Sequence, residues 1–171
     1  HAGGDLDAAR KNFTRALGLN RASGDRAGEA MSLRNLGRLY YQLNDPRTAK
    51  KYLTDALTMV RAVGDQPREL AVLADFVQVE HGLNGLREAI AHVEASLAII
   101  ESTRQSITSR DLRASYSTTN QGFYELYIGL LMKMHSQRPS EGFDSSAFQA
   151  SERARARSLL DTLSESFDEV R

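Results

Sequence analysis

The sequence repeats itself with a step of forty residues. Small and apolar residues recur at matching places in three successive blocks: Ala9, Phe13, Ala16 and Leu17, then Ala49, Leu53, Ala56 and Leu57, then Ala89, Val93, Ser96 and Leu97. The breaks between these segments keep the same step, since Gly24-Asp25 returns as Gly64-Asp65. A fixed period of this length is typical of proteins whose units stack on their neighbours to bury a shared core.

Each block predicts two helices. In residues 5–22 the apolar side chains are spaced three and four apart, which places them on one face of a helix. Gly24 can adopt the left-handed backbone conformation that often ends a helix, and Asp25 can cap the next helix. Pro46 and Pro67 fit the first turn of later helices, where a missing N–H costs nothing. No hairpin signal interrupts this pattern. We therefore predict an all-α fold of about seven antiparallel helices.

The repeat loosens beyond Ser102. A longer helix is predicted over residues 106–135, a loop over 137–146, and a last helix over 145–166 whose core-facing residues include Phe148 and Leu159. The predicted organisation is a set of helix pairs in residues 1–104, followed by a longer helix pair in 105–171. The first helix is expected to be the second member of a pair. The last is expected to lead towards a downstream domain.

The middle block resembles the tetratricopeptide repeat. The resemblance rests on Leu33, Leu36-Gly37, Tyr40, Ala49, Leu53 and Ala56. Gly37 and Ala49 are small where the two helices of the repeat cross closely. The usual unit has about 34 residues, so the longer step is similar to the kinesin-light-chain variety. The resemblance implies an α-solenoid that binds other proteins and is not an enzyme.

A narrower resemblance covers the end of the chain. Residues 112–157 look like the segment that precedes the caspase-like CHAT domain in bacterial tetratricopeptide–CHAT proteins. The match is carried by residues 124–127, 130–131 and 151–161. It implies a bacterial, cytoplasmic protein in which this region is the regulatory arm of a protease-like domain. The sequence beyond Arg171 tests this: a fold with a catalytic His and Cys would support it, and further helix pairs would oppose it.

The first helix of each tetratricopeptide pair lines a concave surface. Transferring the family's ligand positions onto this sequence gives candidate partner-binding residues in two blocks: Met31, Arg34, Asn35, Arg38, Tyr41 and Gln42, then Gln78 and His81. Asn35 matches a family Asn that holds a peptide backbone, and an amide both donates and accepts hydrogen bonds. Arg34 and Arg38 are four residues apart on one face, so together they could take a carboxylate.

Simpler interpretations of the same residues stay open. Exposed arginines on a helix most often form a solvated face, and the Asn35 amide is equally suited to a bond with the neighbouring helix. Asp75 replaces the Asn in the next block, where Ala71 and Ala74 replace long polar side chains. This argues against a full carboxylate clamp. The alternative to partner binding is an intramolecular arm or oligomerisation module whose groove is filled by the rest of the protein.

Composition narrows the possible functions further. Lys+Arg and Asp+Glu both number 22, and this balance argues against binding to nucleic acid or to an anionic membrane surface. Arg153, Arg155 and Arg157 do not share one helix face, so they suit pairing with Glu152 or Asp161 better than tracking phosphates. No apolar run is long enough to span a membrane.

The chain also offers little for metal or redox chemistry. Cysteine is absent, which fits a reducing, cytoplasmic compartment. The four histidines include no pair at the i, i+4 spacing of a helical metal site. No convergent nucleophile and base are visible, and no phosphate loop. We therefore expect no catalytic site, no metal and no cofactor.

The first helix is a candidate for self-association. Leu6, Phe13 and Leu17 lose part of their usual cover if the preceding helix of the pair is absent. We expect a dimer or a crystal contact there. Sedimentation of the protein as a monodisperse monomer would count against it.

Overall fold

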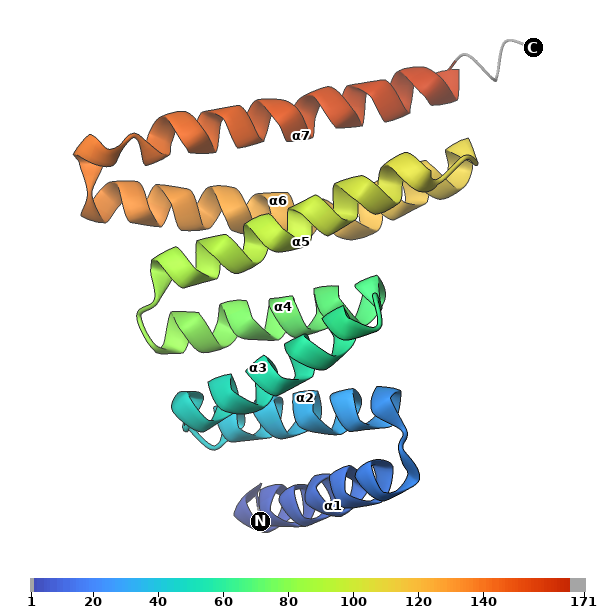
Figure 1. The fold of residues 1–171 in the computed structure, drawn as a ribbon. Coiled ribbons are helices and arrows are strands. Elements are labelled where there is room, and N and C mark those ends of the chain that lie inside the picture. The colour runs from blue at the N-terminus through green and yellow to red at the C-terminus, as the bar shows by residue number, and fades with distance from the viewer. Residues whose placement is uncertain (1, 167–171) are drawn as a thin grey trace. The chain divides into compact units, whose positions relative to one another are not determined.

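The computed structural model describes the backbone of residues 2–166, and their side chains except at 2–4, 110, 111, 114, 117, 118, 158 and 160–166. Within residues 2–166 it contains seven α-helices, one short 3-10 helix and no strand (Figure 1). The elements are α1 Ala2–Ser23, α2 Arg26–Gln42, α3 Pro46–Ala62, α4 Gln66–Gly82, α5 Leu86–Ser106, α6 Arg110–Gln137, η1 Pro139–Glu141 and α7 Phe143–Ser166. The predicted all-α fold of about seven helices is confirmed.

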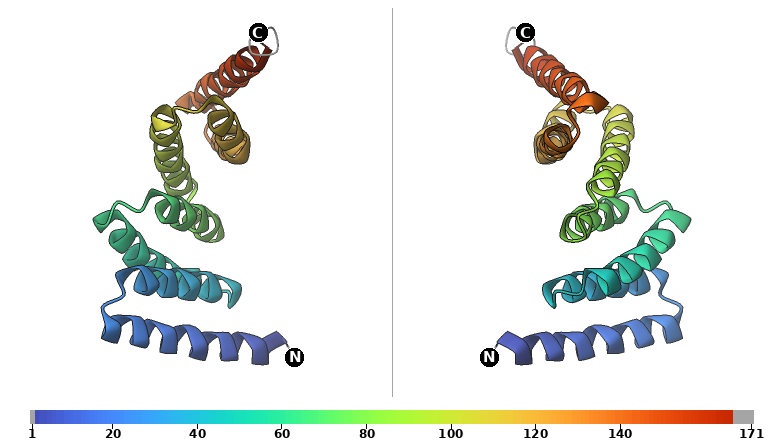
Figure 2. Two further views of the ribbon diagram at one scale, coloured as in Figure 1. Left: turned by 90° about the vertical axis from the view of Figure 1, so that its right-hand side faces the viewer. Right: turned by 90° about the vertical axis from the view of Figure 1, so that its left-hand side faces the viewer.

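The chain divides into two compact units, residues 1–92 and 93–171, with the division inside α5. Within each unit, consecutive helices run in opposite directions, as the two side views also show (Figure 2). The domain division at residues 104 and 105 stays a prediction.

The turns of the first unit alternate between two residue types. Gly24 and Gly64 adopt positive φ angles of 73° and 68°, whereas Asn44 and Asn84 both have a φ of 59°. Glycine adopts this region freely, and Asn is among the residues that tolerate it best. The aspartates that follow cap the next helices: Asp25, Asp45 and Asp65 accept hydrogen bonds from the backbone N–H groups of Gly28, Thr48 and Arg68. The predicted helix end at Gly24, the cap at Asp25 and the first-turn positions of Pro46 and Pro67 are confirmed.

Helices α2 and α3 approach closely at Gly37. A Cβ atom at this position would lie 2.8 Å from two atoms of Leu53 and 3.3 Å from the carbonyl oxygen of Ala49. Ala49 and Leu53 are both fully buried, and the Ala49 atom is backbone, so a side-chain rotation alone would not relieve the clash. The lack of a side chain at Gly37 therefore sets how α2 rests on α3, as the tetratricopeptide pattern predicts.

The forty-residue step is visible in contacts as well as in sequence. Arg21 Nε lies 2.8 Å from Glu29 Oε1 and joins α1 to α2. Forty residues later, Arg61 Nε lies 2.6 Å from Glu69 Oε1 and joins α3 to α4. Equivalent residues thus make equivalent bridges between one helix pair and the next.

One pair of equivalent positions has changed its chemistry. Tyr40 stacks on Tyr52, with ring centroids 5.3 Å apart. Their equivalents are Glu80 and His92, and the His92 Nε2 lies 3.9 Å from the Glu80 carboxylate. Burial lowers the pKa of His92 below its usual 6.5. The imidazole is therefore neutral at neutral pH, and it stacks on Phe76 at 4.5 Å.

In the second unit, α6 buries large apolar residues and α7 buries small ones. Leu130, Leu131 and Met134 of α6 are buried, as are Ala147 and Ala150 of α7. The prediction that Phe148 and Leu159 face the core is wrong, because both are exposed, Phe148 by 67%. Ala147 and Ala150 are three residues apart, so they share the face of α7 that is buried. Phe148 follows Ala147 directly and is therefore turned about 100° around the helix, away from that face.

Two tyrosines of α6 hydrogen-bond to glutamates of α5. The Tyr127 hydroxyl donates to Glu94 at 2.7 Å, and the Tyr124 hydroxyl donates to Glu101 at 3.0 Å. Burial and the bond to Glu94 raise the pKa of Tyr127 to about 12. Arg157 of α7 pairs with Glu101 at 2.6 Å and lies over the Tyr124 ring. These contacts bind the helices of the second unit together.

The three neighbouring arginines of α7 do not act as one patch. Arg155 pairs with Glu152 at 2.7 Å, which confirms one predicted partner, whereas Arg157 faces α5 and α6. The side chain of Asp161, the other predicted partner, lies outside the described residues. The last helix begins at Phe143, two residues before its predicted start, because Gly142 with a φ of 76° ends the loop there.

Candidate functional site

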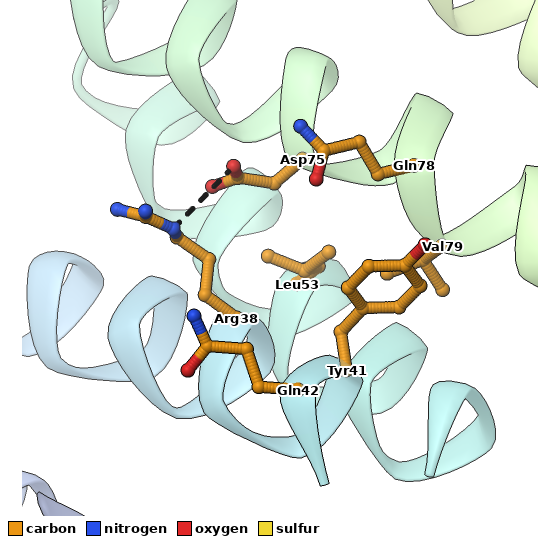
Figure 3. Close-up of a pocket in the computed structure, with 7 residues that line it drawn as sticks. All are labelled: Arg38, Tyr41, Gln42, Leu53, Asp75, Gln78 and Val79. Atoms are coloured by element: carbon orange, nitrogen blue, oxygen red, sulfur yellow. Dashed lines mark ion pairs between the residues drawn. The ribbon is translucent and has the colours of Figure 1, made fainter. Parts of the chain in front are cut away.

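A pocket of about 190 Å³ opens between α2 and α4. Its lining comes from three helices of the first unit: Arg38, Tyr41 and Gln42 of α2, Leu53 of α3, and Asp75, Gln78 and Val79 of α4 (Figure 3). Helix α3 connects the two lining helices and supplies the apolar floor. This is the surface formed by the first helix of each successive pair.

Helical spacing brings the polar side chains in and beside the pocket together. Arg34, just outside the lining, is followed by Arg38 and Tyr41 at intervals of four and three residues on α2, and Asp75 and Gln78 are three residues apart on α4. Residues at these intervals share one face of a helix. Because the opposite faces carry core residues, such as Leu36 and Leu73, the polar stripes of α2 and α4 face the groove.

An ion pair crosses the groove beside the pocket. Arg34 Nε donates to Asp75 Oδ2 at 2.5 Å, although the two residues are 41 apart in sequence. The Arg34 side chain is only 21% exposed and that of Asp75 is less exposed still. Charge-assisted bonds of this length, partly shielded from water, are among the stronger polar contacts in proteins. The pair therefore holds α2 and α4 in register.

Arg38 meets the same carboxylate from further away. Its Nε lies 3.8 Å from Asp75 Oδ1, as the dashed line in Figure 3 marks, and its side chain is 54% exposed. This separation is too long for a hydrogen bond. Within the described part of the chain, the Arg38 guanidinium donates no hydrogen bond. It therefore retains the capacity to bind another acceptor at the mouth of the pocket.

Asn35 follows Arg34 on α2, and its side chain is half-buried. Among the residues that the structure describes, its side chain makes no hydrogen bond to either neighbouring helix. A half-buried amide normally finds a partner in the protein or in water. The contact to a neighbouring helix that the sequence left open is therefore not made in residues 2–166.

The far end of the pocket is aromatic and apolar. Tyr41 and Val79 both line it (Figure 3). A Cβ atom at Gly82 would come within 3.2 Å of the Tyr41 ring, so the ring packs against the end of α4 where no side chain stands. The Gln42 and Gln78 amides, one from each helix, flank this apolar part. The pocket thus combines an apolar floor with polar groups at its rim, which is common in ligand-binding clefts.

The structure brings together part of the predicted partner-binding set. Arg38, Tyr41, Gln42 and Gln78 line the pocket, whereas Met31, Arg34 and Asn35 lie outside its lining on the same helix. His81 is exposed in the last turn of α4 and does not line the pocket. The set's role in binding a partner stays a prediction.

Three lining residues lay outside the predicted set. Leu53 belongs to the buried pattern of the repeat and Val79 is a buried residue of α4, and both line the pocket. Asp75 stands forty residues after Asn35, so the repeat places it on the same face of its helix. The sequence alone does not show that its carboxylate reaches Arg34.

Within the described residues, no group of three or more His, Asp or Glu side chains is placed to hold a metal ion. None of the described helices is both long enough and apolar enough to cross a membrane. The buried carboxylate of Glu80 is engaged by Lys50, whose Nζ lies 2.6 Å away.

Residues 1–62 match the tetratricopeptide repeat family. The match covers α1, α2 and α3, which include Asn35, Gly37 and Arg38. A search of curated proteins finds no significant match. The family match supports a protein-interaction scaffold, because this repeat typically binds protein partners.

Two solved structures share the fold. One is BtubC (BKLC) from P. vanneervenii, with 17% sequence identity and a TM-score of 0.65 over 90% of this chain and 58% of that one. The other consists of nearly identical TPR-like repeats from Podosopora anserina, assigned to kinesin light chain. It has 17% identity and a TM-score of 0.54 over 99% of this chain and 90% of that one. The chain thus spans little more than half of BtubC. Both likenesses establish a tetratricopeptide-like solenoid fold.

Proposed function

We propose that the first unit is a non-catalytic scaffold that binds a peptide or helix of a partner protein in the groove between α2 and α4. The observation that carries this proposal is the pocket in that groove, lined by Arg38, Tyr41, Gln42 and Gln78. The resemblance to the tetratricopeptide repeat assigns the same four residues to the partner-binding face. Their convergence on one pocket is what a binding surface on the first helices of the pairs requires.

The groove offers three kinds of contact to a peptide. The Asn35 amide, which has no hydrogen-bond partner within residues 2–166, can pair with a backbone N–H and C=O of any sequence. Arg38 can bind an acidic side chain. The apolar part around Tyr41 and Val79 can cover an apolar side chain. Backbone contacts would give affinity, and the other two would give a preference for sequence.

We expect peptides selected from a phage-displayed random library to bind the wild type through these residues. Asn35→Ala should weaken a selected peptide about five- to tenfold, which is the loss expected for one or two hydrogen bonds to a peptide backbone. Isothermal titration calorimetry with the synthetic peptide measures the effect. Asn12→Ala, an exposed asparagine of α1, is the matched control and should leave the affinity unchanged. If no peptide is enriched over an unrelated helical protein, the proposal fails.

The resemblance of residues 112–157 to the segment before a CHAT domain supports a finer proposal. In this proposal the scaffold is the arm through which a partner regulates an attached protease-like domain. The support is the sequence resemblance alone. Determining which fold the natural protein has beyond Arg171 tests it, and a continuation in further helix pairs would oppose it.

A further inference from the structure

Asp75 occupies an unusual place in the groove. It is forty residues after Asn35 and so stands at the position where the first pair carries an amide. Both partners of its carboxylate come from the preceding pair: Arg34 at 2.5 Å and Arg38 at 3.8 Å. A carboxylate at this place binds the same arginines that an acidic peptide side chain would need.

We propose that Asp75 is a built-in competitor that partly occupies the arginine pair and so sets how strongly the groove prefers acidic peptides. This inference rests on the proposed peptide-binding function. Arg34 is committed to Asp75, whereas Arg38 is shared between Asp75 and the ligand. Without Asp75, the site would hold two unopposed positive charges. Asp75 therefore weakens the binding of acidic ligands and acts as a specificity-determining residue.

The geometry distinguishes the two arginines. Arg34 makes a direct hydrogen bond to the carboxylate and is mostly shielded from water, so its release would leave a charge in a partly desolvated place. Arg38 has only the longer contact and is more than half exposed. Breaking that contact costs little. A ligand carboxylate would therefore engage Arg38 and leave the Arg34–Asp75 pair in place.

The charges around the site predict a measurable effect. Two arginines and one aspartate leave a single net positive charge, so Asp75→Asn doubles the net charge and also removes the competitor for Arg38. A ligand carboxylate on Arg38 would lie within several ångströms of the Asp75 carboxylate. At intermediate effective dielectric this repulsion corresponds to about a five- to tenfold change in affinity. The effect should be lost for a ligand without a carboxylate.

The experiment uses two synthetic peptides. One is the most enriched acidic peptide from the phage library panned on Asp75→Asn, and the other is its counterpart with Glu replaced by Gln. We expect Asp75→Asn to bind the Glu peptide about five- to tenfold more tightly than the wild type does, with less than about a twofold change for the Gln peptide. Asp55→Asn, which removes an exposed aspartate from α3, changes the net charge equally and should have no such effect.

A second variant tests whether Asp75 acts by competing for Arg38 or only through the net charge of the site. It also avoids leaving Arg34 without its partner. Arg34→Gln with Asp75→Asn removes both members of the ion pair and restores the wild-type charge. If Asp75 competes for Arg38, this double variant still binds the Glu peptide several-fold more tightly than the wild type. Equal affinity of the two would overturn the proposal, because net charge alone would then explain the single variant. In an Arg38→Gln background, Asp75→Asn should no longer matter.

The outcomes separate this inference from the function on which it rests. If peptides bind through Asn35 but the Glu and Gln peptides respond alike to Asp75→Asn, Asp75 does not set specificity while the groove remains a peptide site. If neither the wild type nor Asp75→Asn enriches any peptide, both proposals fall. Circular dichroism of each variant confirms that the helices have formed.

Discussion

Gly37→Val is expected to lower the free energy of unfolding of the first unit by about 3 kcal/mol. The first carbon of the new side chain would lie 2.8 Å from Leu53 and 3.3 Å from the Ala49 carbonyl oxygen, and valine adds two further methyl groups. Both neighbours are fully buried, so relief requires α2 to move away from α3. Urea denaturation followed by circular dichroism measures the loss as a lower midpoint.

Gly18→Val in α1 is the matched control for this prediction. A Cβ atom at Gly18 has no other group within 4 Å, so the same substitution in the neighbouring helix meets open space. Valine has a higher intrinsic helix propensity than glycine, and Gly18→Val should therefore leave the midpoint unchanged or raise it slightly. Equal losses at the two positions would show that backbone freedom, and not the helix crossing, is what Gly37 provides.

The consequence of Gly37→Val extends to the pocket. Leu53, the residue that a side chain at Gly37 would strike, is also the floor of the pocket between α2 and α4. Moving α2 away from Leu53 would also displace Arg38, which follows Gly37 directly on α2. A stability defect at the helix crossing and a binding defect in the groove are therefore expected to appear together.

Most of the fold follows from local signals in the sequence. The forty-residue step, the Gly and Asn turns and the Asp caps each act over a few residues, so they define helix boundaries without knowledge of distant contacts. Gly37 required slightly more: its small size is meaningful only because Ala49, twelve residues away, is small as well. The repeat provided that link, since neighbouring helices in a repeat pair are joined by short turns.

The parts that could not be predicted depend on contacts between successive pairs. Arg34 and Asp75 are 41 residues apart, and only the angle between the pairs decides whether they meet. The sequence indicated that Arg34 and Arg38 could take a carboxylate, but not that the chain supplies one itself. In the second unit the repeat is lost, and the large side chain of Phe148 was assigned to the core when small alanines occupy it.

The ion pair between Lys50 and Glu80 is another contact between helices that the sequence does not predict, and its loss should have a large effect on stability. Glu80 replaces the tyrosine found forty residues earlier at Tyr40, and this change is visible in the sequence. Its pairing with Lys50 of the preceding helix cannot be read from the sequence. The Glu80 side chain is 2% exposed, and Lys50 Nζ lies 2.6 Å from it. We expect Lys50→Met to lower the free energy of unfolding by about 2–3 kcal/mol, because it leaves a buried carboxylate without its main counter-charge.

The expected loss is smaller than for a fully buried pair because Lys50 is 45% exposed, so water already screens part of the attraction. A double variant, Lys50→Met with Glu80→Gln, separates the lost pair from the lost packing. It removes the buried charge together with its partner, and should recover most of the stability that Lys50→Met loses. Urea midpoints of the two variants and the wild type measure this. If the double variant is no more stable than Lys50→Met alone, the ion pair does not account for the loss, and the aliphatic part of Lys50 is what supports α4.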